Sequence, residues 1–186
     1  MLAREPIVRR LLLVEPADNL VPTLRAKFRS NPKVQVIHGY MDDVEVQESV
    51  DAVCCVNVLE HVEDDLRFLY QARKRLEYGG HLLLFVPALP WLFGTLDLAF
   101  GHYRRYTRAS LANRLTDAGF TPILMRYINL VGVVTWFLAG KVLRRTTITR
   151  FDVTVYDRFV VPWLSHAERL VSPPIGQSLI AVGRAV

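Results

Sequence analysis

Six short runs of mainly apolar residues recur along this chain, and each has the length of a buried β-strand. Segments with helical spacing of apolar residues, or loops, separate the first four runs at lengths that suit parallel crossovers. The pattern therefore predicts an α/β protein with a Rossmann-like, doubly wound and mostly parallel sheet. The predicted strands are 10–15, 33–37, 51–56, 81–86, 121–127 and 177–183.

The segment 51–65, DAVCCVNVLEHVEDD, contains the clearest candidate site. Its apolar strand ends at Asn57, and a helix that ends near Glu77 is expected to follow directly. Ligands of open α/β sheets bind at the carboxyl ends of the strands, so Asn57, Glu60 and His61 are expected at the rim of a site. The alternative is that these residues only begin a helix.

Two later stretches are longer than connections need to be. The loop PALPWLFGTLDLAFGHYRRY at 87–106 is rich in proline and aromatic residues, and long loops in compact domains are commonly functional. Thr107 is then expected to cap a helix that ends at Ala118. Apolar spacing at 129–145 and 155–170 predicts a helical insert, 129–170, before the last strand, with Pro162 bending or breaking its second helix.

Composition limits the alternatives. With 186 residues, 51% of them hydrophobic, the chain can form one substantial core, and no linker divides it, so 1–186 is predicted as a single domain. The net charge of +5 favours anionic partners mildly. The arginines are spread along the chain and mixed with acids, so nucleic-acid binding is not predicted.

The two cysteines and the apolar runs bear on the compartment. Cys54 and Cys55 are adjacent in a predicted strand and should point to opposite faces, which argues against a disulfide or a cysteine-based zinc site. This fits a reducing compartment, and a cytoplasmic location is predicted. No apolar run has the length needed to cross a membrane, and the N-terminus lacks a small-residue cleavage site, so a soluble protein without a signal peptide is expected.

The order of these elements, with the motifs NVLEHVEDD and RLEYGGHLLLFVPALPWLFGTLDLAFGHYRRYT, resembles the bacterial small-molecule branch of the class I S-adenosylmethionine-dependent methyltransferases. The resemblance covers nearly the whole chain. It implies S-adenosylmethionine as the cofactor and methyl transfer to a small-molecule or glycan/lipid-precursor acceptor. The alternative is a catalytically inactive, methyltransferase-like binding or scaffold protein.

The resemblance also implies the cofactor-binding residues. Glu15 matches the acid that accepts hydrogen bonds from the ribose hydroxyls, for which two carboxylate oxygens are suited, and Pro16 would flank the ribose and adenine. Tyr40, Met41 and Asp42 stand where the family usually has a Gly-Asp pair, so packing on the adenine and a contact to its amino group are expected from them. The residues expected along the methionine side are Asn57, Val58 and Leu59.

Methyl transfer from a sulfonium is an in-line displacement, so the enzyme must position a nucleophile and remove its proton. His61 and His102 are the predicted catalytic bases because the ordinary pKa of histidine is close to neutral. The alternative for His61 is local packing at a helix start, and for His102 a solvated position in the loop. Glu60, His61 and His102 could also hold a metal ion, but no spacing requires one and no metal is predicted.

The long loop is expected to bind the substrate. Its arginines and tyrosines could bind an anionic group, or could form only a basic surface beside a helix start. Trp91 would act as a lid, or would anchor the loop to the core. The predicted substrate-binding residues are Glu60, Trp91, Tyr103, Arg104, Arg105 and Tyr106.

The insert 129–170 has apolar stretches together with Trp136, Arg144 and Arg145. Contact with a membrane surface would suit a lipid-linked substrate. Ordinary core packing or a homodimer interface explains the same residues more simply. Peripheral membrane contact and homodimerisation therefore both stay open.

The methyltransferases that this chain resembles begin with a strand and a Gly-rich turn, whereas Gly39 is the single glycine before 51–65. Residues 1–5, MLARE, resemble the end of the helix that follows that turn. The resemblance thus implies an N-terminally incomplete domain. The neighbours of the missing strand would lose ladder hydrogen bonds, and the cofactor would bind weakly.

Overall fold

The structure is a computed structural model that describes residues 3, 5–44, 49–149, 154, 156, 158–159, 161–170 and 172–186. It divides into two compact units, Met1–Glu48 and Ser49–Val186. The single domain expected for 1–186 stays a prediction.

The first unit contains two parallel strands, β1 (Leu11–Glu15) and β2 (Val34–His38), as predicted. Helix α1 (Val21–Phe28) follows β1 only after a turn. The chain turns first: the backbone N–H of Ala17 donates to the carboxylate of Glu15 over 2.9 Å. A single 3-10 turn, η2 (Met41–Asp43), follows β2.

The second unit is built on a four-stranded sheet in the order β3-β4-β6-β5. Its strands are β3 (Val50–Val56), β4 (Leu76–Pro87), β5 (Phe120–Ile128) and β6 (Ser178–Ala185). β3 and β4 are parallel, whereas β6 is antiparallel to both of its neighbours. The Rossmann-like α/β class is confirmed, with its parallel pairings at β1–β2 and β3–β4.

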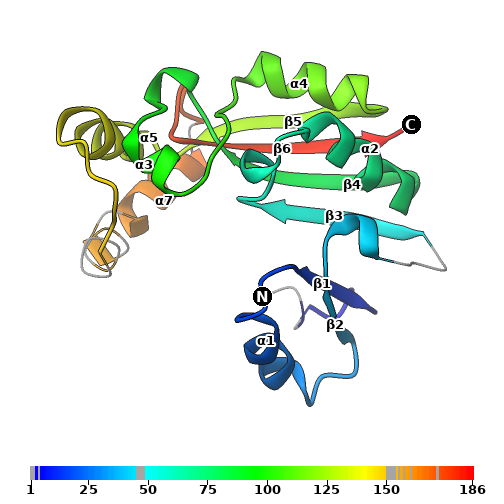
Figure 1. Cartoon of the computed structure of the whole chain (residues 1–186). Coiled ribbons are helices and arrows are strands. Elements are labelled where there is room, and N and C mark those ends of the chain that lie inside the picture. Colours follow the sequence, from blue (N-terminus) through cyan, green and yellow to red (C-terminus); the bar gives the residue numbers. More distant parts are fainter. Residues whose placement is uncertain are drawn as a thin grey trace. The chain divides into compact units, whose positions relative to one another are not determined.

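Helices α2 (Asp65–Arg75) and α4 (Arg108–Asp117) cover one face of this sheet (Figure 1). They bury Leu69 and Leu115 completely against it. Such burial stabilises the fold by roughly 1.5–3 kcal/mol per large aliphatic side chain. Thr107 is the N-cap of α4, as predicted, and accepts a hydrogen bond from the backbone N–H of Ser110 over 3.0 Å.

The expectation that a helix follows β3 directly is wrong. Asn57 has a left-handed backbone (φ 50°), and a separate 3-10 turn, η3 (Leu59–His61), comes next. Helix α2 starts only at Asp65, because the carboxylate of Asp64 accepts a hydrogen bond from the backbone N–H of Arg67 (2.9 Å) and caps it there. It ends at Arg75, since Leu76 already pairs with Val50 in the sheet.

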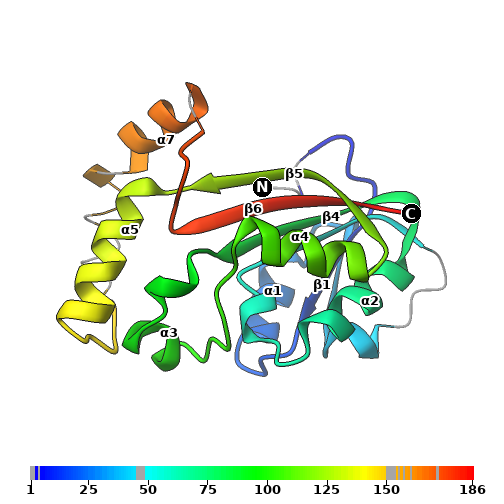
Figure 2. The same cartoon turned by 90° about the horizontal axis from the view of Figure 1, so that it is seen from above.

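Several short helices gather at the end of the sheet toward which β3 and β4 run (Figures 1 and 2). They are η4 (Pro90–Leu92), α3 (Thr95–Ala99), α5 (Leu130–Trp136), the π-helix η5 (Phe137–Val142) and α7 (Val161–Leu170). Pro162 lies in the first turn of α7, where proline is tolerated. The predicted stretch 155–160 is described only in part, so a bend or break of 155–170 at Pro162 stays a prediction. No helix among the described residues is long and apolar enough to cross a membrane.

Hydrogen bonds close the base of the helical insert, which leaves the sheet after β5 and returns at β6. The backbone N–H of Gln177 donates to the carbonyl of Asn129 (3.0 Å), and the Asn129 side chain donates to that of Gln177 (2.7 Å). From α7, Glu168 accepts the backbone N–H groups of Asn129 and Leu130, both at 2.9 Å. We call Asn129, Glu168 and Gln177 the neck of the insert.

Replacing Gly176 with alanine should damage this neck. A Cβ at Gly176 would overlap the backbone carbonyl of Ile128 and lie 2.7 Å from its carbonyl carbon, so the backbone itself must move. Overpacking of this kind costs about 1–3 kcal/mol. Chemical denaturation should show that loss for Gly176→Ala. It should show none for Gly140→Ala, whose added Cβ meets Leu96 at an ordinary 3.7 Å. Equal stability of the two variants would contradict the prediction.

Candidate functional site

A group of polar side chains lies within the second unit, beyond the end of β3. The turn η3 supplies Glu60 and His61, helix α3 supplies Asp97, and the loop after α3 supplies His102 and Arg105. We call these five residues the polar cluster. Gly101, with φ 74°, makes the tight turn that directs the chain back after α3.

Asp97 is the centre of the polar cluster and is completely buried. Its carboxylate accepts hydrogen bonds from His102 Nδ1 (2.9 Å), Arg105 Nε (2.7 Å), Trp136 Nε1 (3.1 Å) and the backbone N–H of Gly94 (3.0 Å). Burial by itself would raise the pKa of Asp97, but the bond from His102, with the charge of Arg105 and the bonds from Arg105 and Trp136, lowers it below the ordinary value. Asp97 therefore stays ionised and holds its partners.

The two histidines of the polar cluster are adjacent. The ring centroids of His61 and His102 lie 4.8 Å apart in an edge-to-face arrangement. Asp97 holds Nδ1 of His102, and the carbonyl of Gly101 lies 3.3 Å from Nδ1 of His61, so each ring keeps Nε2 for another partner. Burial, and then the charge of His102, lower the pKa of His61, which leaves it neutral and able to accept a proton at pH 7.

Glu60 is a buried acid, with 1% of its surface exposed. Its Oε2 has no hydrogen-bond partner among the residues that the structure describes. Burial raises the pKa of Glu60 above the ordinary value, although a backbone hydrogen bond and the charges of His102 and Arg105 act in the opposite direction. One ligand atom each from Glu60, His61 and His102 lie within 4.8 Å of one another.

Arg105 and Arg104, both predicted to bind substrate, are engaged within the protein. The guanidinium of Arg105 is fully buried, donates to Asp97 and to the carbonyl of Ala88 (3.0 Å), and stacks on Trp136 at 4.8 Å. Arg104 pairs with Asp65 at 3.0 Å. The structure thus places Arg105 in a supporting position rather than on the surface.

The other predicted substrate-binding residues divide into exposed and buried ones. Tyr106 is buried, and its hydroxyl donates to Asp65 over 3.0 Å; burial is the main reason why its pKa is raised. Tyr103 and Trp91 are each 53% exposed and are available to a ligand. The backbone N–H of Tyr103 donates to the carbonyl of Glu60 (2.8 Å), so Tyr103 lies beside the polar cluster.

The predicted cofactor residues of this second unit lie at the end of β3. The backbone N–H of Asn57 donates to the carbonyl of Phe85 over 2.9 Å, which ties the turn to β4. Val58 is 38% exposed, whereas Leu59 is completely buried in the core. Cys54 is exposed and Cys55 is buried, so the prediction that they face opposite sides of the strand is confirmed.

The first unit brings together the other predicted cofactor residues. Glu15 ends β1 and pairs with His38 at the end of β2, and the backbone N–H of Gly39 donates to the carbonyl of Glu15 (3.1 Å). Tyr40 and Met41 follow directly, with Tyr40 69% exposed. Asp43, rather than Asp42, accepts the backbone N–H of Tyr40 over 2.8 Å. Pro16 follows Glu15 in the turn before α1.

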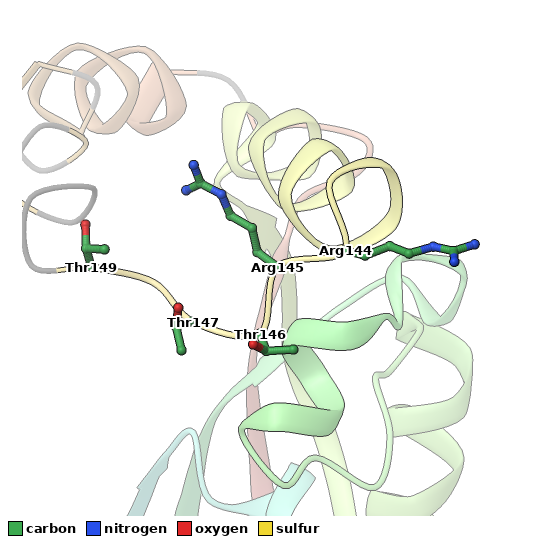
Figure 3. Close-up of a pocket in the computed structure, with 5 residues that line it drawn as sticks. All are labelled: Arg144, Arg145, Thr146, Thr147 and Thr149. Atoms are coloured by element: carbon green, nitrogen blue, oxygen red, sulfur yellow. The ribbon is translucent and has the colours of Figure 1, made fainter.

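A hollow of about 350 Å³ lies along the chain after η5, and no residue of the polar cluster lines it. Arg144, Arg145, Thr146, Thr147 and Thr149 line it, but the two arginine side chains extend in opposite directions (Figure 3). Their guanidinium groups do not converge on one ligand position. This hollow is therefore a weaker candidate than the polar cluster.

The sequence matches known methyltransferases. A family model described as a methyltransferase domain matches residues 2–124. A Mycobacterium tuberculosis protein named as a probable S-adenosylmethionine-dependent methyltransferase is 25% identical over 122 residues, which are 64% of this chain and 43% of that relative. The mitochondrial ubiquinone biosynthesis O-methyltransferase of Schizosaccharomyces pombe is 33% identical over 54 residues, 29% of this chain and 20% of its own length. The chain thus spans less than half of these relatives.

Solved structures share the fold. An S-adenosylmethionine-dependent methyltransferase from Mesorhizobium loti aligns with a TM-score of 0.62 at 16% identity, over 95% of this chain and 80% of its own. The N-methyltransferase NodS from Bradyrhizobium japonicum, solved in complex with S-adenosyl-L-homocysteine, aligns with a TM-score of 0.57 at 13% identity, over 95% and 66%. These similarities confirm the predicted fold.

Proposed function

We propose, since this chain belongs to the methyltransferase-domain family, that it transfers a methyl group from S-adenosylmethionine to a small-molecule acceptor. The names of the curated relatives and the S-adenosyl-L-homocysteine bound to NodS support this choice of cofactor. The observation that carries the proposal is the polar cluster: proton acceptors are gathered beyond the carboxyl end of β3, where ligands of α/β sheets bind. Free cysteines are compatible with a reducing, cytoplasmic setting.

The chemistry follows from the cluster. A hydroxyl or amine of the acceptor would be held beside His61 and His102, where it loses its proton. The nucleophile's electron pair then forms a bond to the methyl carbon while the carbon–sulfur bond breaks and leaves its pair on sulfur. The products are the methylated acceptor, S-adenosyl-L-homocysteine and one proton. Asp97 is a positioning residue, because it holds Nδ1 of His102 and directs Nε2 away from itself.

An apolar surface on the insert supports an acceptor with a lipid part. Val134, Phe137, Leu138 and Leu143 are 42–62% exposed along α5, η5 and the residue after it. Trp91 lies 6.3 Å from Phe137, ring centroid to ring centroid, which connects this surface to the long loop. A lipid-linked precursor presented at a membrane surface would suit these side chains. A homodimer interface would occupy the same surface and exclude it.

Titration of S-adenosylmethionine into the chain by calorimetry tests the proposal. We expect binding to the folded chain, or to the chain extended by whatever the reading frame encodes upstream of Met1. Absence of heat with both would reject the function. Binding without any methyl transfer to a small-molecule extract would favour the inactive binding or scaffold protein.

Glu15 provides a sharper test, because its carboxylate is proposed to accept both ribose hydroxyls. Glu15→Ala removes hydrogen bonds to a charged group, each of which is worth about 1.5–3 kcal/mol. Because two such bonds are lost, we expect S-adenosylmethionine to bind at least about 100-fold more weakly. Glu5→Ala, at an exposed acid of the same unit, should bind it like the wild type. Equal affinities of the wild type, Glu15→Ala and Glu5→Ala for S-adenosylmethionine would show that Glu15 does not bind the cofactor.

A further inference from the structure

Three side chains of the polar cluster offer metal ligands to one point. Glu60 contributes a carboxylate, and His61 and His102 contribute imidazoles; one ligand atom of each lies within 4.8 Å of the others. Ligand atoms 2.0–2.1 Å from a tetrahedral ion lie roughly 3.4 Å apart, so the three need to approach by up to about 1.4 Å. A shift of the exposed His61 side chain supplies this approach without moving the core.

Both imidazoles are already oriented as metal ligands usually are. A metal-bound histidine typically donates its other ring N–H to a carboxylate or a backbone carbonyl. His102 does so to the buried carboxylate of Asp97 (2.9 Å), and Nδ1 of His61 lies 3.3 Å from the carbonyl of Gly101. These contacts fix Nδ1 as the protonated nitrogen and leave Nε2 of each ring as the ligand atom.

The surroundings of Glu60 independently indicate that a cation binds here. Its side chain is buried with 1% exposure, and Oε2 lacks a hydrogen-bond partner among the described residues. A buried carboxylate oxygen without a partner carries a desolvation cost that a bound cation would remove. Arg105 attracts the Glu60 carboxylate through its charge, but its Nε donates to Asp97 at 2.7 Å and it makes no hydrogen bond to Oε2. Oε2 of Glu60 is therefore the atom left to bind a cation.

We infer that Glu60, His61 and His102 bind one divalent transition-metal ion through two imidazoles and one carboxylate. Imidazole and carboxylate ligands suit Zn²⁺, Co²⁺ and Fe²⁺ better than Mg²⁺ or Ca²⁺, which prefer oxygen alone. Three protein ligands leave at least one position of the ion open. The role in catalysis, though not the binding itself, rests on the proposed methyl transfer. The acceptor's hydroxyl would occupy the open position, where the ion lowers the pKa of the hydroxyl and its proton leaves to water.

Cobalt provides a direct test, because Co²⁺ bound by nitrogen and oxygen ligands absorbs visible light. Titration of the metal-free chain with Co²⁺ should give absorption bands that saturate at one ion per chain and disappear when Zn²⁺ is added. His61→Ala should weaken Co²⁺ binding by at least about tenfold, the loss seen even for residues that only support a ligand. His81→Ala, at an exposed histidine on β4, should bind Co²⁺ like the wild type.

Thermal unfolding with and without Zn²⁺ is the second readout, and it reports on folding as well. The ion should raise the melting temperature of the wild type and of His81→Ala, but not that of His61→Ala. Absence of Co²⁺ bands, or the same affinity in His61→Ala, would overturn the metal site and leave direct proton transfer to a histidine. S-adenosylmethionine binding is measured separately, so a chain that binds the cofactor but no Co²⁺ retains the proposed function without the ion. A chain that binds Co²⁺ but no cofactor loses the proposed function and retains the site.

Discussion

Asp97→Ala should lower the free energy of unfolding by about 3–5 kcal/mol, the range observed when one partner of a buried ion pair is removed. The variant leaves the guanidinium of Arg105 buried without its counter-charge, and leaves His102 Nδ1 and Trp136 Nε1 without an acceptor. Urea denaturation followed by circular dichroism measures the loss. Asp117→Ala is the matched control, because this aspartate is exposed at the end of α4, and it should change stability by no more than about 0.5 kcal/mol.

The contribution of Asp97 to the free energy of unfolding should also depend on pH. Because its pKa is lowered in the folded protein, the carboxylate stabilises the fold above the unfolded pKa of about 3.9, and this contribution disappears as the pH falls through the folded value. The groups that face it are His102, Arg105 and Glu60. The difference in the free energy of unfolding between wild type and Asp97→Ala should thus be largest at pH 7 and decrease below about pH 4. A difference that stays constant or grows on acidification would contradict this assignment.

His102→Ala should reduce methyl transfer by about 10²- to 10⁴-fold, which is the usual contribution of a positioned group that assists proton removal. The variant removes the imidazole that Asp97 holds beside Glu60 and His61. The rate can be followed as S-adenosyl-L-homocysteine released from S-adenosylmethionine in the presence of a small-molecule extract of the source cells. The affinity for S-adenosylmethionine should change little, so the loss should appear in turnover.

The control for this experiment is His81→Ala, which should retain the wild-type rate. Near-wild-type turnover of His102→Ala would exclude His102 from the reaction. A parallel loss of cofactor binding or of the folded circular dichroism spectrum would indicate a structural role instead.

The strands could be predicted from the sequence because most are nearly continuous apolar runs, and 33–37 alternates polar and apolar residues as a strand does. The start of α2 could not, since Val58, Leu59 and Val62 have the spacing of a helix although the chain forms a separate turn there. The left-handed backbone at Asn57 and the cap at Asp64 decide the outcome, and neither changes the apolar pattern. Likewise, 76–80 resembles a helix end but joins β4, because a neighbouring strand supplies its hydrogen bonds.

The candidate site was only partly predictable, for a similar reason. Glu60, His61 and His102 have residue types that are chemically informative, and the structure brings them together. Asp97 was missed because it is a lone acid in the apolar stretch FGTLDLAF, and its partner Trp136 lies 39 positions away. The one nearby residue that could have drawn attention to Asp97 is His102, five positions later. For Arg105 the sequence could not distinguish an exposed substrate contact from a buried partner of that unrecognised acid.

The neck of the insert has a consequence for how this protein can vary. Asn129 and Gln177 join the two ends of the insert by hydrogen bonds. The insert is therefore a loop whose ends are held together where it meets the sheet. The entropic cost of closing a loop rises by only about 0.6 kcal/mol when its length doubles. Apart from Trp136, which binds Asp97, and Glu168, which belongs to the neck, the insert can therefore change in length with little cost to the strands below. The insert can in this way vary in sequence and length while the strands and the polar cluster keep their positions.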